Sequence, residues 1–275
     1  MTDAVTYAYA VVRHDAEGLD AALAGVVGVA GKPVHLVPQG PGSDLAAVVS
    51  TVPAQDFQES ALRRHLEDLD WLETVARAHH TVIEILSAHT TVLPLRLATV
   101  YLDEDRVRGA LRDDAEMFTR ALDRLAGHIE WGVKIYVEPR AETAGPADPA
   151  ADDDVGAGRA YLRARRAQRH SRDEAHRAAG QAAERVEEIG DAVAAAHARH
   201  RVQQGELASG AGENVVNDAY LVAREKAETF RAEILRAAEG LPGIRVDVTG
   251  PWAPYSFAAQ PGTEPRAPEA PDQAP

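Results

Sequence analysis

Cysteine is absent from the 275 residues of the sequence. A chain without cysteine has no disulfide framework, no thiolate nucleophile and no cysteine-based zinc site. It also lacks a charge-free apolar run of about 18 residues, the length that a membrane-spanning helix needs. The opening residues, MTDAVTYAYAVVRHD, lack the basic and apolar pattern of a secretory leader. We therefore expect a cytoplasmic protein that does not span a membrane.

Positive charge is scarce as well. The chain has 29 Lys and Arg against 43 Asp and Glu, a formal net charge of −14. Because an acidic surface is repelled by nucleic acids and anionic membranes, this balance argues against both as partners. The content of 45% apolar and 26% charged residues is typical of a soluble globular protein. The length suits one large domain or two ordinary ones.

Motifs that mark common catalytic or cofactor sites are missing from the sequence. GVVGVAG (25–31) has neither the glycine spacing of a dinucleotide-binding turn nor the Lys and Ser/Thr of a P-loop. No G-x-S-x-G nucleophile elbow is present either. We therefore expect no cofactor and no catalytic residue of a recognisable type.

Two weak metal-binding candidates keep an alternative open, a metal-dependent enzyme of unmarked type. His197 and His200 are three residues apart in HARHR and would share one face of a helix. The run ADDDVG holds three carboxylates at 152–154, which suit a hard cation. The basic surroundings of the histidines and the Pro, Ala and Gly beside the carboxylates favour a helix surface and a solvated linker instead.

Hydrophobic periodicity predicts alternating strands and helices. We expect strands over 5–13, 91–101, 130–138 and 243–250, and a hairpin formed by 33–37 and 45–51. Helices are expected over 17–24, from the capping-box pair Asp56 and Glu59 to Leu86, and from the cap Asp103 to Leu125. Two long helices, about 158–205 and 214–239, are expected to fold back as an antiparallel hairpin.

This order predicts an α+β protein with two modified ferredoxin-like α/β sandwich domains, the second with the long antiparallel helical hairpin. We expect an N-terminal domain over 1–90 and a C-terminal domain over 91–259, and the strand at 91–101 fits either of them. The Pro, Ala, Asp and Gly content of 139–158 predicts a mobile linker. The Pro-rich tail, 260–275, is expected to be disordered.

Six stretches occur in this order along the chain: YAYAVV, LAAVVSTVP, DLDWLETVARAHHTVIE, TVLPLRLATVY, HIEWGVKIYVE and VDVTGPWAPYSF. Together they resemble the gas vesicle accessory protein family of the GvpL/GvpF type, in a match that spans residues 5 to about 257. The family often has an aromatic residue and Gly after the Arg of its LPLR segment. This chain has Leu97 and Ala98 there, a departure that concerns local packing.

The resemblance implies a non-enzymatic accessory protein that is a minor component of gas vesicles. It implies binding to the small hydrophobic shell protein, protection of that protein from aggregation, and help in vesicle nucleation and assembly. The partners implied are the major shell protein and other vesicle accessory proteins, and the location implied is the cytoplasm, in association with gas vesicles. An acidic carrier that covers an apolar face or an unpaired strand edge would suppress edge-to-edge association.

Several residues are candidates for contact with the shell protein, although aromatic side chains more often pack in a core. The candidates are the aromatic residues of the last stretch, the strand at 130–138 and the arginine inside TVLPLRLATVY. Pro94 in that stretch indicates an edge strand or a strand end, because proline cannot donate to a sheet ladder. The candidate residues are Arg96, Trp131, Lys134, Trp252, Tyr255 and Phe257.

Overall fold

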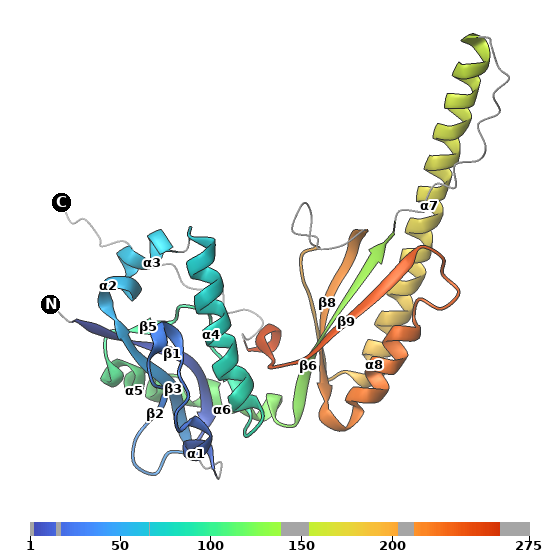
Figure 1. Ribbon diagram of the computed structural model, residues 1–275. Helices are drawn as coiled ribbons and strands as arrows, with labels where there is room; N and C mark the ends of the chain where they lie inside the picture. The colour runs from blue at the N-terminus through green and yellow to red at the C-terminus, as the bar shows by residue number, and fades with distance from the viewer. Residues whose placement is uncertain (1–2, 15–17, 66, 139–153, 203–211, 259–275) are drawn as a thin grey trace, which may run out of the picture. The chain divides into compact units, whose positions relative to one another are not determined.

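The computed structural model describes residues 3–14, 18–65, 67–138, 154–202 and 212–258 (Figure 1). The expected linker residues 139–153 and the tail 260–275 lie outside these ranges. By internal contacts the chain divides into a first unit, residues 1–128 with 252–275, and a second unit, residues 129–251. Among the described helices, none is long and apolar enough to cross a membrane.

The first unit is built on an antiparallel sheet in the order β2-β3-β1-β4, with β5 also paired to β1. The predicted hairpin of β2 and β3 is confirmed. Pro94 ends β4, an edge strand in this order, as its missing N–H requires. The strands are β1 (Ala4–Arg13), β2 (His35–Pro38), β3 (Leu45–Pro53), β4 (Val92–Pro94) and β5 (Val100–Tyr101).

Helices contact the sheet of the first unit on both faces, which explains why eight consecutive residues of β1 are buried. Tyr7 and Tyr9 lie on the face of the sheet that packs with the buried residues of α4. Val11 and Ala47, its neighbour on β3, point to the opposite face. The helices are α1 (Leu19–Leu23), α2 (Ala54–Phe57), α3 (Glu59–His65), α4 (Leu69–Ser87), α5 (Glu104–Asp113) and α6 (Ala115–Leu125). Two short 3-10 turns, η1 (Val29–Gly31) and η3 (Tyr255–Phe257), complete the unit.

The prediction of one long helix from Asp56 to Leu86 is wrong. Gln58 has an extended backbone that ends α2, and α4 begins only after Asp68. The side chain of Asp68 accepts hydrogen bonds from Asp70 N and Trp71 N, both at 3.1 Å, and so caps α4. The predicted cap Asp103 is confirmed, because its carboxylate accepts from Arg106 N at 2.8 Å.

The second unit repeats the strand order of the first with its own elements. Its sheet runs β7-β8-β6-β9, so in both units the second strand is an edge and the first and third are central. The helices cover one face, where Trp131, Val133 and Ile135 of β6 pack with Val186 and Phe230. The elements are β6 (His128–Val137), α7 (Asp154–Val193), β7 (Ala196–Arg199), β8 (Glu213–Ala223), η2 (Arg224–Lys226), α8 (Ala227–Arg236) and β9 (Ile244–Trp252).

The prediction of a helical hairpin in the second unit is wrong. Residues 213–223 form a strand, and only 227–236 of the expected second helix are α-helical. The side-chain amide of Asn214 donates to Ile135 O at 3.2 Å and to Val216 O at 2.7 Å, which ties β8 to β6. Tyr220 of β8 packs so closely under α7 that a Cβ on Gly190 would lie 2.3 Å from its ring. Sheet pairing therefore decides the structure of this segment.

The predicted strand 91–101 is two short strands on the same edge of β1, joined by a loop, 95–99, that stays beside this edge. Leu95 N donates to Tyr9 O at 2.8 Å, and Ala8 N donates to Thr99 O at 2.9 Å, so the whole stretch belongs to the first unit. Within the loop, the backbone N–H and the hydroxyl of Thr99 both donate to Arg96 O, at 3.1 and 2.7 Å. Ala98 adopts φ 61°, the left-handed region that favours glycine.

We predict that Ala98→Gly raises the free energy of unfolding by about 0.5 to 1 kcal/mol. Glycine removes the left-handed strain of an L-residue, about 1 to 2 kcal/mol, and this gain exceeds the cost of the added entropy of the unfolded chain, about 0.4 to 1 kcal/mol. Urea unfolding measures the change. Ala76→Gly in α4 is the control, because at ordinary helical φ it should lower stability by about 1 kcal/mol. Equal losses in both variants would contradict the assignment of strain to Ala98.

Candidate functional site

An exposed group of aromatic rings lies on the first unit, where the segment 252–257 packs against α4. The ring centroids of His80 and Trp252 are 5.4 Å apart, and those of His80 and Tyr255 are 6.2 Å apart. Trp252 is 39% exposed and Tyr255 is 37% exposed, which is unusual for side chains of this size. We call His80, Trp252 and Tyr255 the aromatic patch.

The segment 252–257 is anchored at both ends. Ala253 is part of the buried core of the first unit, and Phe257 is 7% exposed. Arg124 on α6 donates to the carbonyl oxygen of Phe257 at 2.8 Å. Because both flanks are fixed, Trp252 and Tyr255 are held at the surface by the core beneath them.

A buried hydrogen-bond chain lies under the aromatic patch. Ala98 N donates to the hydroxyl of Tyr7 at 3.1 Å, and this hydroxyl is 2.9 Å from Nδ1 of His79. The hydroxyl accepts from Ala98 N and has both a proton and a second lone pair left for the imidazole, so it pairs with His79 Nδ1 in either tautomer. Burial raises the pKa of Tyr7 well above its usual value, and the nearby Tyr255 contributes to that increase. The chain thus links β1, α4, the loop 95–99 and the aromatic patch.

His79 itself is buried, with 3% exposure, and its ring centroid is 6.4 Å from that of Tyr255. Burial, with a smaller contribution from the neighbouring His80, lowers its pKa to about 4. His80 is half-buried, because adjacent residues of a helix point to different sides. The importance of His79 was missed, although its spacing from Val75, Val82 and Ile83 could have indicated a place in the core.

The predicted contact residues divide into exposed and buried ones. Arg96 is exposed at the loop 95–99, next to Leu97, which is 36% exposed. Trp131 is 3% exposed and packs under the helices of the second unit, as its alternation with Val133 also indicates. Lys134 lies on β6 and is partly exposed. The structure brings Trp252, Tyr255 and Phe257 together in the first unit and places Trp131 and Lys134 in the second.

The histidine pair proposed as a metal site does not lie on a helix. His197 is in strand β7 and His200 follows directly after it, so the helical geometry expected for this pair is wrong. The ring of His197 stacks on Tyr220, with centroids 4.7 Å apart, and its Nε2 is 3.1 Å from the buried Asp218. In the described ranges no group of three His, Asp or Glu side chains is arranged to hold a metal ion. Of the acidic run 152–154, residues 152 and 153 lie outside the described ranges, and Asp154 is the first residue of α7.

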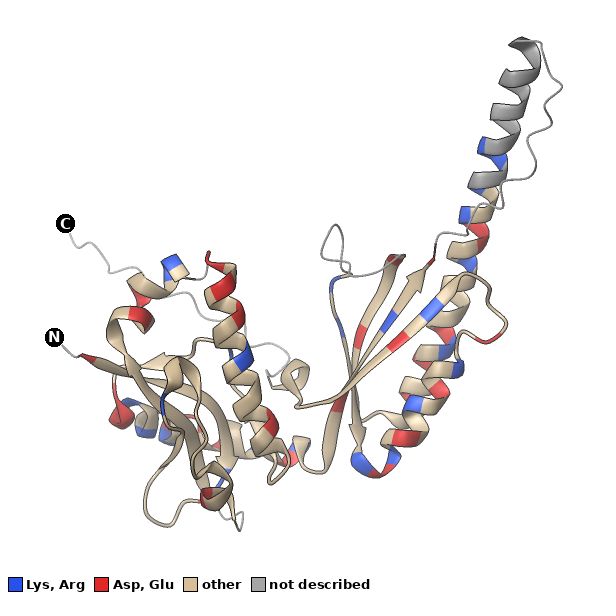
Figure 2. Cartoon of the chain, in the orientation of Figure 1, with Lys and Arg blue, Asp and Glu red and all other residues tan. Residues whose placement is uncertain are grey.

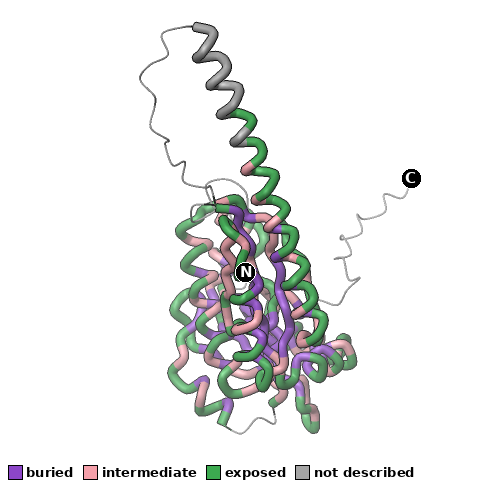
Figure 3. The backbone as a smooth tube through the Cα atoms, turned by 90° about the vertical axis from the view of Figure 1, so that its right-hand side faces the viewer, coloured by how far each residue is buried: buried purple, intermediate pink, exposed green. Residues whose placement is uncertain are grey.

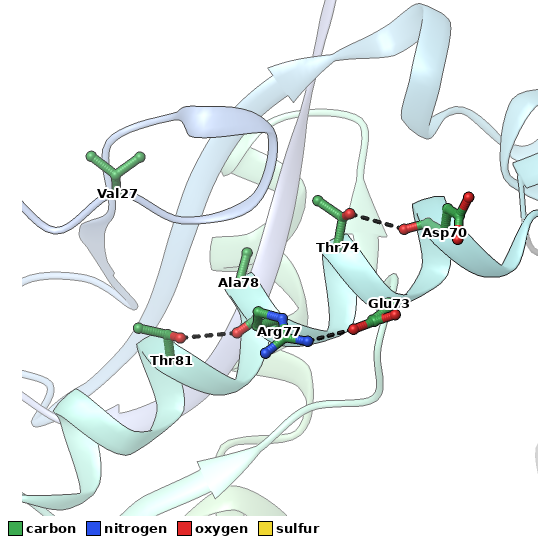
Figure 4. Close-up of a pocket in the computed structure, with 7 residues that line it drawn as sticks. All are labelled: Val27, Asp70, Glu73, Thr74, Arg77, Ala78 and Thr81. Atoms are coloured by element: carbon green, nitrogen blue, oxygen red, sulfur yellow. Dashed lines mark hydrogen bonds and ion pairs between the residues drawn. The ribbon is translucent and has the colours of Figure 1, made fainter.

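An open depression of about 480 Å³ lies between Val27 and the outer side of α4 (Figure 4). Its polar side chains are engaged with their own helix: Glu73 pairs with Arg77, Thr74 donates to Asp70 O at 2.9 Å, and Thr81 donates to Arg77 O at 3.0 Å. These are ordinary contacts of an exposed helix surface, and they do not converge on a common point. The aromatic patch is therefore the stronger candidate for binding.

Comparison with known proteins identifies relatives over nearly the whole chain. The sequence profile of the family "Gas vesicle synthesis protein GvpL/GvpF" matches residues 5–259. The chain is 46% identical over 258 residues to gas vesicle protein L of Streptomyces sp. (strain CB03234), with 94% of each protein covered. It is 27% identical over 267 residues to gas vesicle protein F of the same strain, covering 92% of this chain and 98% of that protein.

Solved structures show the same fold. The crystal structure of gas vesicle protein GvpF from Anabaena sp. PCC7120 matches with a TM-score of 0.62 at 17% identity, covering 94% of this chain and 97% of that one. GvpF from Microcystis aeruginosa matches with a TM-score of 0.56 at 17% identity, covering 93% and 99%. The mixed helical and antiparallel-sheet architecture predicted from the sequence is therefore confirmed.

We predict that stability falls with acidification between pH 6.5 and about 4 because of His79. The unfolded histidine titrates near 6.5 and the folded one near 4, so the unfolded chain binds more protons in this window. The free energy of unfolding is fully retained above pH 6.5 and falls below it by up to about 1.4 kcal/mol per pH unit.

The variant His79→Gln tests this assignment by chemical unfolding at a series of pH values. The substitution should make the free energy of unfolding less dependent on pH between 4 and 6.5, even if it lowers stability at neutral pH. His89→Gln is the matched control and should keep the wild-type profile, because His89 is an exposed histidine beyond the end of the same helix. An unchanged pH profile in His79→Gln would show that another group titrates in this range.

Proposed function

The chain belongs to the gas vesicle synthesis protein GvpL/GvpF family, and on that premise we propose that it is a non-enzymatic accessory protein that binds the hydrophobic shell protein of gas vesicles. In this proposal it covers an apolar surface of the shell subunit, prevents aggregation, and releases the subunit for vesicle nucleation and assembly. It acts in the cytoplasm in association with gas vesicles. Other vesicle accessory proteins are further partners.

The aromatic patch is the observation that carries this proposal. Trp252 and Tyr255 offer two large, partly exposed rings whose positions are fixed by the buried segment ends Ala253 and Phe257. Fixed aromatic side chains lose little conformational entropy on binding, and Trp and Tyr are enriched among the residues that dominate binding energy. A shell subunit with an exposed apolar face would bury its surface against these rings.

Residues of the loop 95–99 extend the proposed contact. Leu97 adds an apolar side chain, and Arg96 adds a cation on a surface whose net charge is otherwise acidic. Arg96 would orient the shell protein by binding one of its carboxylates or backbone carbonyls, while the aromatic rings supply most of the binding energy. Phe257 is buried and helps to fix the position of the patch. In the second unit Trp131 is buried in the core, so Lys134 is the candidate contact residue that remains there.

We also propose that both units are modified ferredoxin-like sandwiches. The second unit has the element order β-α-β-β-α-β, and the first has the same order from β1 to β4 when α2 and α3 are set aside. Both units have the strand order second-third-first-fourth. The modification in the first unit is the pair α5 and α6, which contacts the sheet in addition to α1 and α4. In this proposal the two domains correspond to the two units, with the strand segment 91–101 in the first.

Co-expression with the shell protein tests the proposed function. We predict that Trp252→Ala combined with Tyr255→Ala lowers co-purification of the shell protein at least roughly tenfold, since each truncation of such an anchor costs about 1 to 2 kcal/mol of binding. The soluble fraction of the shell protein should fall in parallel.

Leu235→Ala is the matched control, because Leu235 is an equally exposed apolar side chain on α8 at 44% exposure. It should leave co-purification unchanged, and circular dichroism should show that both variants fold. Wild-type co-purification by the folded double variant would remove the aromatic patch from the shell contact. Failure of the wild-type protein to bind or to keep the shell protein soluble would overturn the proposed function itself.

A further inference from the structure

Helix α7 is too long for its own sheet to cover. Its 40 residues extend about 60 Å at 1.5 Å per residue, whereas the 11 residues of β8 extend only about 37 Å. Figure 1 shows the helix running well past the end of the sheet. In the described part of α7, whose side chains are seen at 165, 166 and from 169 onward, the first buried residue is Ala179. The part before it is largely exposed (Figure 3).

Charge is divided along this helix. Between 159 and 177 the sequence has seven arginines and two acidic residues, although the whole chain has a net charge of −14. Between 178 and 193 it has four acidic residues and one arginine. Figure 2 shows this change of colour along the described part of α7. The helix therefore has a basic half and an acidic half.

Like charges repel one another in the basic half. Arg166, Arg169 and Arg172 follow at intervals of three and are neighbours on the helix surface, and Glu213 on β8 pairs with Arg172. Most helical stability in proteins comes from a face that packs against the rest of the fold, and in the described part of α7 buried residues begin only at Ala179. An acidic partner surface would remove this repulsion.

Nucleic acid and membrane are poor matches for this surface. The remainder of the chain is strongly acidic and repels polyanions. Between 159 and 177 the apolar side chains larger than alanine are the adjacent Tyr161 and Leu162, so the sequence lacks the continuous apolar face that inserts into a lipid interface. An acidic protein surface fits better, and the acidic half of α7 is one that every copy of this chain carries.

We propose that two copies of this chain associate through antiparallel pairing of their α7 helices. The stripe opposite the buried Ala182 and Val186 carries exposed charges along its whole described length. In an antiparallel pair centred between Arg177 and Gly180, Arg166 lies across from Asp191 of the second copy and Arg169 across from Glu188. Asp173, on the same stripe, lies across from Glu184 of the second copy, and Arg177 lies one turn from both carboxylates and offsets their repulsion. The arrangement is twofold symmetric and closed, so every basic half meets an acidic half.

Gly180 supplies an independent reason for a crossing at this point. It is exposed in the middle of the helix, and a Cβ built on it would have nothing within 4 Å. Packing within its own unit therefore does not require glycine, and glycine destabilises a helix interior relative to alanine. Where two helices cross, the missing side chain lets their backbones approach closely. Gly180 stands at the centre of the proposed pair.

Sedimentation velocity at low and high salt tests the pairing. The wild-type protein should be dimeric at about 50 mM NaCl and should dissociate at least roughly tenfold more readily at about 500 mM, because salt screens exposed charges. A monomer at both salt concentrations would overturn the proposal, and so would a dimer whose affinity does not respond to salt.

Two charge-reversed variants make the test specific to α7. One carries Arg166→Glu, Arg169→Glu and Arg177→Glu, and the other carries Glu184→Arg, Glu188→Arg and Asp191→Arg. Each alone should be monomeric, since the substituted stripe is then acidic throughout in the first variant and almost entirely basic in the second, whereas a mixture of the two should form a heterodimer. Dimerisation of either variant alone, or no association in the mixture, would overturn the assignment.

A substitution at the crossing provides the second, charge-independent measurement. Gly180→Leu should fold and should weaken the dimer at least roughly tenfold, because the added side chain separates the two backbones. Gly109→Leu in α5 is the matched control, as Gly109 is likewise helical with open space around it. An unchanged dimer in Gly180→Leu would place the contact elsewhere. Shell-protein binding is measured separately and should survive in all these variants, so its failure and the failure of the dimer are distinguishable.

Discussion

The hydrogen-bond chain from Ala98 through Tyr7 to His79 is the constraint on which the first unit depends. It satisfies three polar groups in the interior and joins a central strand, a helix and a loop that are far apart in the sequence. Tyr9 makes a parallel link, since its hydroxyl bonds Ser50 at 2.9 Å and accepts from Val29 N at 2.8 Å. Buried polar links of this kind fix one arrangement of neighbouring elements, because any slip would leave a buried group unpaired.

The same chain explains why the aromatic patch is rigid. His79 and His80 are adjacent on α4, so the residue that is fixed in the core also sets the direction of its exposed neighbour. Tyr255 lies close to both rings, and Trp252 packs on His80. A partner would therefore meet aromatic side chains that are already ordered, which lowers the entropy that binding costs.

Local signals in the sequence predicted the elements that are specified locally. Asp103 caps its helix, and the alternation around Trp131 gives β6, because a cap and a period of two are properties of neighbouring residues. The run from Val215 to Val222 is apolar except at Asn217 and Asp218, so its pattern fits a helix and a strand equally well. Its pairing with β6 and β7 decides that it forms a strand. Tyr7 and His79 are 72 residues apart, and no pattern in the sequence joins them. For that reason the aromatic residues of the candidate site could be named, but their buried support could not.

The two proposed surfaces differ in the physics that governs them. The aromatic patch would act through burial of apolar area, which moderate salt does not weaken. The α7 stripe would act through exposed charges, which salt screens. Both units share one strand order, yet the first has helices that pack on both faces of its sheet, while the second extends one helix beyond the sheet that supports it. Because the two surfaces belong to separate units and respond in different ways to ionic strength, shell contact and self-association can vary independently, and neither requires the chain to change its fold.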